Sequence, residues 1–235
     1  MLPIYIICHA NCVPHDYLCS FFDERNIPYY KINIISDDIS RVDLNTVSGL
    51  VLMGGPHSVN DNHRWLVDEV KFIRQAMEKN IPVMAVCFGA QLISKVLGAK
   101  VYRAEHMETG WHQISVDASD VDSDVTLKLD NSFEVFEWHE DTFSIPETGV
   151  PIFTGRNFKN QGYLAGNVLA MQFHLEMTES MVFEWLERYQ DCIPEPSRYV
   201  QSPEQISEHL SERLEKLHDV ADKVYDWWLN RVKNQ

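Results

Sequence analysis

A chain of 235 residues is long enough to bury a sizeable core, in one large domain or two small ones. Its content of 45% hydrophobic and 23% charged residues is typical of a globular protein. The net charge of −15, without a cluster of lysine and arginine, argues against nucleic acid or an anionic membrane as a partner.

The beginning of the chain has no basic segment typical of a secretory signal, and no apolar run is long enough to span a bilayer. The 5 cysteines are an odd number at irregular spacings, which indicates a reducing compartment rather than a disulfide framework. We therefore expect a cytoplasmic protein.

Five potential metal ligands lie close together near the N-terminus: Cys8, His9, Cys12, His15 and Cys19. A tetrahedral site would need a second C-x2-C pair to close it, and the sequence has none. Thiols of this kind are commonly buried. We expect buried thiols after a first strand, and no metal site.

The N-terminal half alternates strands and helices. Strands are predicted at 4–8, 28–34, 49–53 and 82–87, and helices at 17–22, 65–79 and 91–97. This alternation predicts a parallel sheet covered on both faces, with ligands at the carboxyl ends of its strands. Gly54, Gly55 and Cys87 lie at such ends, so we expect them to converge.

Short alternating segments follow from residue 100 to about 171, at 113–116, 125–129, 133–136 and 151–153. They predict mixed or antiparallel strands layered against the first sheet. A helix is predicted over 179–189.

The C-terminal part begins after Pro194-Glu195-Pro196, which breaks the pattern and predicts a main domain at 1–191 and an extension at 192–235. Ser202, Pro203 and Gln205 are typical of a helix start with a capping box. Apolar residues then recur at helical spacing to Trp228, which predicts one long amphipathic helix. Its apolar stripe must be covered, either by the chain's own main domain or by a partner or second copy.

Cys87 ends an apolar strand, and Gly89 and a helical pattern follow it. A sulfur at such a turn lies at a helix N-terminus, where backbone N–H groups and the helix dipole favour the thiolate. Gly89 allows a sharp turn and lets a substrate approach the backbone. The alternative is a buried cysteine without chemistry, so the interpretation depends on partners elsewhere.

His174 ends another apolar segment, and Glu176 follows two residues later. In an extended chain the two side chains face the same way. Glu176 would then orient the imidazole while His174 accepts a proton from Cys87. The alternative is a core histidine whose hydrogen bonds are satisfied.

Two motifs, Cys87-Phe88-Gly89-Ala90-Gln91 and His174-Leu175-Glu176, together resemble the C-x-G-x-Q and H-x-E motifs of triad-type (class I) glutamine amidotransferases. Met53-Gly54-Gly55-Pro56 is similar to the glycine-rich loop of that family. Trp138-His139-Glu140-Asp141 is similar to a segment of members related to the amidotransferase domain of GMP synthase and its standalone relatives. The resemblance covers roughly residues 4–189.

The resemblance implies an α/β fold: a three-layer, doubly wound, mostly parallel, flavodoxin-like sheet. We also expect a small antiparallel or mixed strand layer and a C-terminal amphipathic helix. The main domain at 1–191 would then be the catalytic domain.

The resemblance also implies that Cys87, His174 and Glu176 form a catalytic triad. Cys87 would attack the γ-carboxamide of glutamine, and the γ-glutamyl thioester would be hydrolysed with release of glutamate and ammonia. The backbone N–H groups of Gly55 and Phe88 are the expected oxyanion donors. No cofactor is expected.

Substrate contacts are expected from Gln91, His139 and Asp141. The alternative for Gln91 is a capping amide in the first turn of a helix. For His139 and Asp141 it is a polar junction between strand and loop. Glu140 and Gly162 stand where related members often have glycine and alanine.

Three functions follow from these motifs. The first is a glutamine amidohydrolase that supplies ammonia to a separate synthase chain, because the sequence has no P-loop signature. The second is a γ-glutamyl peptide or amide hydrolase. The third is a non-catalytic regulatory or binding module on the same fold. A homodimer is a further expectation among the partners.

Overall fold

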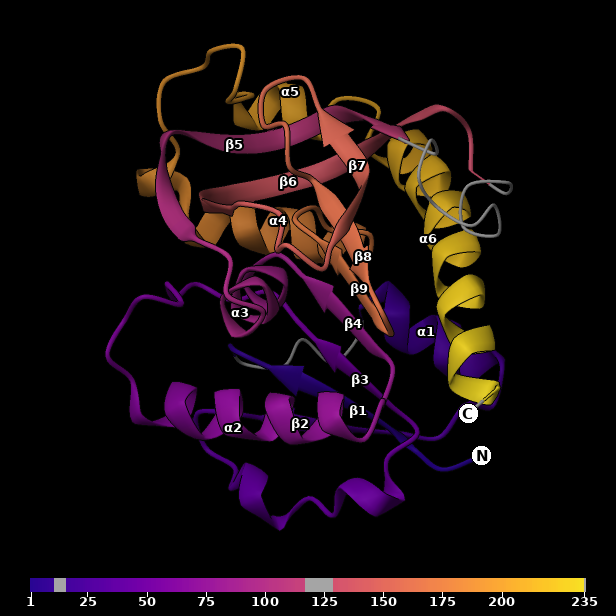
Figure 1. Cartoon of the computed structure of the whole chain (residues 1–235). Helices are drawn as coiled ribbons and strands as arrows, with labels where there is room; N and C mark the ends of the chain where they lie inside the picture. The colour runs from indigo at the N-terminus through magenta and orange to yellow at the C-terminus, as the bar shows by residue number, and fades with distance from the viewer. Residues whose placement is uncertain (11–15, 117–128, 235) are drawn as a thin grey trace.

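One sheet of nine strands organises the computed structural model, which describes residues 1–10, 16–116 and 129–234 (Figure 1). The strand order is β2-β1-β3-β4-β9-β8-β7-β5-β6. The parallel strands are β1 (Ile4–Cys8), β2 (Tyr29–Asn33), β3 (Gly49–Leu52), β4 (Val83–Val86) and β9 (Val168–Met171). The antiparallel strands are β5 (Val101–Val116), β6 (Ser132–Phe143), β7 (Val150–Gly155) and β8 (Gly162–Ala165).

Helices cover both faces of the sheet. They are α1 (Tyr17–Glu24), α2 (Arg64–Glu78), α3 (Phe88–Val96), α4 (Glu179–Arg188), α5 (Pro203–Ser207) and α6 (Leu210–Lys233). Short 3-10 turns are η1 (Ile39–Arg41), η2 (Leu44–Thr46) and η3 (Gln190–Cys192).

The core is divided by the sheet because side chains of a strand alternate between its faces. In β4, Met84 and Val86 pack into the cluster that includes α1, α4 and α6. Val83 and Ala85 pack into the cluster that includes α2 and α3. All four are buried, which explains why the strand reads as a continuous apolar run.

The predicted α/β class and the alternating strands and helices of the N-terminal half are confirmed. One detail differs, because the antiparallel strands continue the parallel sheet rather than stacking on it. Strand β9 joins the two parts, pairing in parallel with β4 and antiparallel with β8. The strand predicted at 125–129 falls almost wholly outside the described residues, as do Cys12 and His15.

The helix start at Ser202 is confirmed. The N–H of Ser202 donates to Oε1 of Gln205 at 2.9 Å, and the N–H of Gln205 donates to Oγ of Ser202 at 3.3 Å. This is the reciprocal pair of a capping box.

The prediction of one long helix is wrong, because the chain breaks at His209, which has φ 55°. The indole of Trp111 donates to the carbonyl of Ile206 at 3.0 Å. In a continuous helix the same carbonyl would accept from a backbone N–H of the next turn. The chain then continues as α6.

The apolar stripe of α6 is buried against its own chain, beside α1 (Figure 1). Tyr225 packs edge-on against Phe21 of α1. Trp228 is fully buried, and its ring would lie 3.0 Å from a β-carbon at Gly49. The main domain of the same chain therefore covers this apolar stripe. None of the helices in the described parts of the chain is apolar enough over a sufficient length to cross a bilayer.

Candidate active site

A cavity of about 720 Å³ opens at the carboxyl ends of β1, β3, β4 and β9. Its size falls within the range of about 300–1,000 Å³ that is common for small-molecule sites. Seven residues predicted from the sequence line it together: Gly55, Cys87, Gln91, His139, Asp141, His174 and Glu176. Phe88, the eighth, adjoins them as the first residue of α3.

Cys87 occupies the sharp turn between β4 and α3. Its backbone has φ 49° and ψ −108°, a strained conformation for a residue with a β-carbon. The turn is held by its N–H, which donates to the carbonyl of Met171 at 2.8 Å. Gly89 is required here, because a β-carbon would lie 2.2 Å from the carbonyl oxygen of Leu52. The sulfur is thus fixed at the N-terminus of α3.

His174 follows β9 and is oriented by Glu176. Its Nδ1 lies 2.6 Å from Oε1 of Glu176, and both side chains are almost fully buried. Its backbone N–H donates to the carbonyl of Phe136 at 2.9 Å, and its ring packs edge-on against Trp185. Because the carboxylate accepts from Nδ1, Nε2 faces a different partner.

The group beside Nε2 of His174 is Cys87. Burial alone would lower the pKa of His174, but the nearby charges of Glu176 and Cys87 and the hydrogen bond to Glu176 raise it well above the ordinary 6.5. Nε2 makes no hydrogen bond of normal geometry with the described residues, which is common for catalytic groups before a substrate binds. The raised pKa favours the protonated form of the ring beside Cys87.

Two buried residues support the glycine loop after β3. The sequence did not indicate that they hold this loop. Nδ1 of His9 donates to the carbonyl of Met53 at 2.8 Å, and its Nε2 lies 2.8 Å from Oε1 of Glu69. A β-carbon at Gly55 would lie 2.6 Å from Cβ of His9. His9 and Glu69 are 60 residues apart in the chain, so local sequence carries no signal of their pairing.

Gly55 lines the same cavity, and Phe88 directly follows the lining residue Cys87 at the start of α3. Within the described parts of the chain, neither backbone N–H group is paired with a hydrogen-bond acceptor. Both are therefore available to donate to an oxygen atom of a ligand near Cys87.

The three expected substrate contacts differ in what they offer. The amide of Gln91 donates to the carbonyl of Asp141 at 2.9 Å and to Oε1 of Gln172 at 3.3 Å. Both of its N–H groups are therefore used within the protein. The carboxylate of Asp141 accepts from the hydroxyl of Ser58 at 2.6 Å and borders the cavity.

His139 lies in a buried cluster with two glutamates. Its Nδ1 donates to the carbonyl of Asp141 at 3.0 Å, and its Nε2 lies 3.3 Å from Glu108 and 3.4 Å from Glu137. Both ring nitrogens are thus engaged by protein groups. Glu108 also accepts from Gln161 at 2.9 Å.

Glu137 is the unusual member of this cluster. It is fully buried, and apart from the contact of Oε2 with Nε2 of His139 at 3.4 Å, which lacks hydrogen-bond geometry, its carboxyl oxygens have no partner among the described residues. Burial, and then the charge of Glu108, raises its pKa well above the ordinary 4.5. Glu137 therefore tends to keep its proton, which avoids two like charges side by side.

Comparison with known proteins finds similarity to glutamine amidotransferases and to GMP synthases. A family model described as Glutamine amidotransferase class-I matches residues 23–182. One subunit of the GMP synthase (glutamine-hydrolyzing) of Sulfolobus acidocaldarius is 31% identical over 148 residues, which are 61% of this chain and 74% of that protein. A GMP synthase (glutamine-hydrolyzing) of Spiroplasma kunkelii is 25% identical over 150 residues, 63% of this chain but 28% of its own length.

A solved structure extends the similarity to nearly the whole chain. The crystal structure of a glutamine amido transferase from Methylobacillus flagellatus superposes with a TM-score of 0.91 at 29% identity. The superposition covers 98% of this chain and 95% of the other, so it includes the C-terminal helices.

Proposed function

This chain belongs to the class I glutamine amidotransferase family, and on that premise we propose that it hydrolyses glutamine through a covalent γ-glutamyl intermediate on Cys87. The observation that carries the proposal is the convergence of Cys87, His174 and Glu176 in one cavity at the carboxyl ends of the strands. A nucleophile, a base and a group that orients the base are the minimum for this chemistry.

The reaction begins with the thiolate of Cys87. Its sulfur attacks the γ-carbonyl carbon of glutamine, and the oxygen gains negative charge that the N–H groups of Gly55 and Phe88 stabilise. One such donor contributes about 3–4 kcal/mol at the transition state. The C–N bond then breaks, and the proton of His174 passes to the departing ammonia.

The second half releases glutamate. His174, now neutral, removes a proton from a water molecule, which attacks the thioester carbon, and the C–S bond breaks to restore the thiolate and the imidazolium. Glu176 keeps the ring in one orientation through both halves.

Asp141 is our candidate for binding the α-ammonium group of the substrate, since its carboxylate borders the cavity. We assign Gln91 and His139 a positioning role instead of direct contact, because their N–H groups and ring nitrogens are engaged by the carbonyl of Asp141 and by other protein groups. Both would hold the Asp141 segment in place.

The ammonia is proposed to pass to a separate synthase chain. The support is an analogy, because the Sulfolobus relative is named as one subunit of its enzyme. The cytoplasmic location, the boundary between 191 and 192, and a homodimer stay predictions.

Glutamate release from purified protein tests the proposal. With glutamine and γ-glutamyl dipeptides offered in parallel, we expect turnover of glutamine. Cleavage of the dipeptides alone would favour the γ-glutamyl hydrolase and overturn the amidotransferase reaction.

Cys87→Ala separates catalysis from a binding role. It should abolish glutamate release, whereas Cys192→Ala, which removes an exposed thiol bordering the same cavity, should leave release intact. Equal activity of Cys87→Ala and the unmodified protein would contradict the proposed nucleophile.

A further inference from the structure

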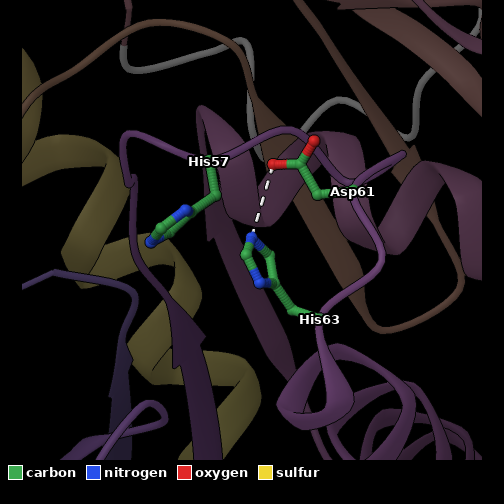
Figure 2. A group of neighbouring side chains, drawn as sticks. All are labelled: His57, Asp61 and His63. Carbon is green, nitrogen blue, oxygen red and sulfur yellow. Dashed lines mark ion pairs between the residues drawn. The ribbon is translucent and has the colours of Figure 1, made fainter.

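The loop between β3 and α2 carries three side chains that the proposed glutamine chemistry does not use. His57, Asp61 and His63 gather where this loop enters α2, and Figure 2 shows them as neighbours with the Asp61–His63 ion pair marked. One potential ligand atom from each lies within 4.8 Å of the others.

The spacing of these atoms suits a small cation. Zinc binds imidazole nitrogen and carboxylate oxygen at about 2.0–2.2 Å, so tetrahedral ligand atoms stand about 3.3–3.6 Å apart. Nε2 of His63 already lies 3.5 Å from Oδ2 of Asp61. A ring nitrogen of His57 lies within 4.8 Å of a ligand atom of each of the other two residues, so the set closes when its ring shifts toward them.

The ligands are also held by their neighbours. The ring of His63 stacks on Trp65 with an interplanar angle of 11°, and the ring of His57 packs edge-on against the same indole. Oδ2 of Asp61 accepts from the backbone N–H of Ser58 at 3.0 Å. Outer contacts that orient the ligands are characteristic of metal sites in proteins.

A second group of possible ligands, Glu108, Glu137 and His139, is less suitable. It is buried, and Glu108 is occupied by hydrogen bonds from Asn157 and Gln161. By contrast, the side chains of His63 and Asp61 are 38% and 44% exposed, so an ion can reach them from solvent.

We propose that His57, Asp61 and His63 form a binding site for a divalent transition metal ion of the zinc type. Two imidazoles and one carboxylate match the preferences of zinc, and a fourth position is open to solvent. The proposal departs from the expectation of no metal, and it does not depend on glutamine being the substrate.

The bound ion would connect the loop to the active site. His57 and Ser58 both border the cavity, and Ser58 donates to Asp141 at 2.6 Å. The ion would therefore fix the segment that follows the glycine loop.

Zinc binding to the full chain in a Cys87→Ala background tests the site, because the active-site thiol is then removed as a competing ligand. Isothermal titration with Zn²⁺ should show one ion per chain. Asp61→Asn, which keeps an acceptor for the Ser58 N–H, and His63→Gln should each weaken binding at least about tenfold. His106→Gln, at another partly exposed histidine, should not.

Cobalt supplies a second readout that does not depend on the fold of a variant. Co²⁺ bound at this site should show ligand-field bands without the intense thiolate-to-metal band in the near ultraviolet. A thiolate band, the absence of Zn²⁺ binding, or unchanged binding in Asp61→Asn and His63→Gln would overturn the proposal.

Discussion

Gly54 leaves the space that the ring of His174 needs: a β-carbon at position 54 would lie 2.9 Å from Cε1 of that ring. The same β-carbon would lie 3.5 Å from Cβ of Cys87. The glycine loop thus forms the surface on which the imidazole and the thiol meet, and it limits the position of both.

Gly54→Ala should therefore displace the imidazole from the thiol. We expect a loss of roughly 100-fold in kcat/KM for glutamine, because misplacement of a catalytic group by about 1 Å has effects of this order. The measurement is steady-state glutamate release, with a urea unfolding curve to show that the fold is intact. Full activity in a folded Gly54→Ala protein would show that Gly54 does not position His174.

Glu176→Gln should shift the pH dependence of activity. The negative charge of Glu176 helps to raise the pKa of His174, so its removal lowers that pKa and the imidazolium is lost at a lower pH. The alkaline limb of kcat/KM should move toward lower pH, together with a fall in the maximum. Glu187→Gln, on the exposed side of α4, should leave the pH profile unchanged. If the alkaline limb does not move in Glu176→Gln, Glu176 does not raise the pKa of His174.

Glu137→Gln should change how stability varies with pH. The pKa of Glu137 is raised in the folded state, so its contribution to stability is fully present below the unfolded-state value and is lost as pH rises toward the folded-state value. Relative to Glu137→Gln, the unmodified protein should lose up to about 1.4 kcal/mol per pH unit in this window.

Urea unfolding from pH 4 to 8 measures this difference, with the exposed Glu147→Gln as the matched control. The two curves of the Glu137 pair should converge at the acid end. Parallel curves would mean that Glu137 ionises normally in the folded protein.

Trp228→Ala tests whether α6 is part of the main core. The indole is fully buried and packs over Gly49, so its removal should lower the free energy of unfolding by about 3–5 kcal/mol. Phe183→Ala, where the side chain is 48% exposed, should change stability by less than about 0.5 kcal/mol. Similar small effects of both would mean that α6 is not integral to the fold.

Local patterns predicted the elements that depend on local physics. The buried strand, sharp turn and helix around Cys87 were evident from an apolar run, a glycine and helical spacing, and the Ser202 capping box from three residues. The convergence of Cys87 with the glycine loop followed from the rule that parallel strands present their carboxyl ends at one edge, whereas its meeting with His174 was implied by the family resemblance.

Long-range contacts account for what the sequence did not predict. The carbonyl of Ile206, just before the break at His209, accepts from the indole of Trp111, and the glycine loop is supported by His9 and Glu69. The pairing of Nε2 of His139 with Glu108 on the neighbouring strand β5 is a further contact that the sequence did not indicate. Each of these partners is distant in the chain, so no short-range pattern could reveal it.

Covalent labelling tests the central claim most directly, since it does not require a synthase partner for activity. The full chain is treated with an electrophilic glutamine analogue that alkylates thiols, and the modified cysteine is located by mass spectrometry. We predict one label per chain, on Cys87, and slower labelling in excess glutamine. Labelling of Cys192 instead, or labelling of Cys87 that glutamine does not slow, would contradict a glutamine site built around Cys87.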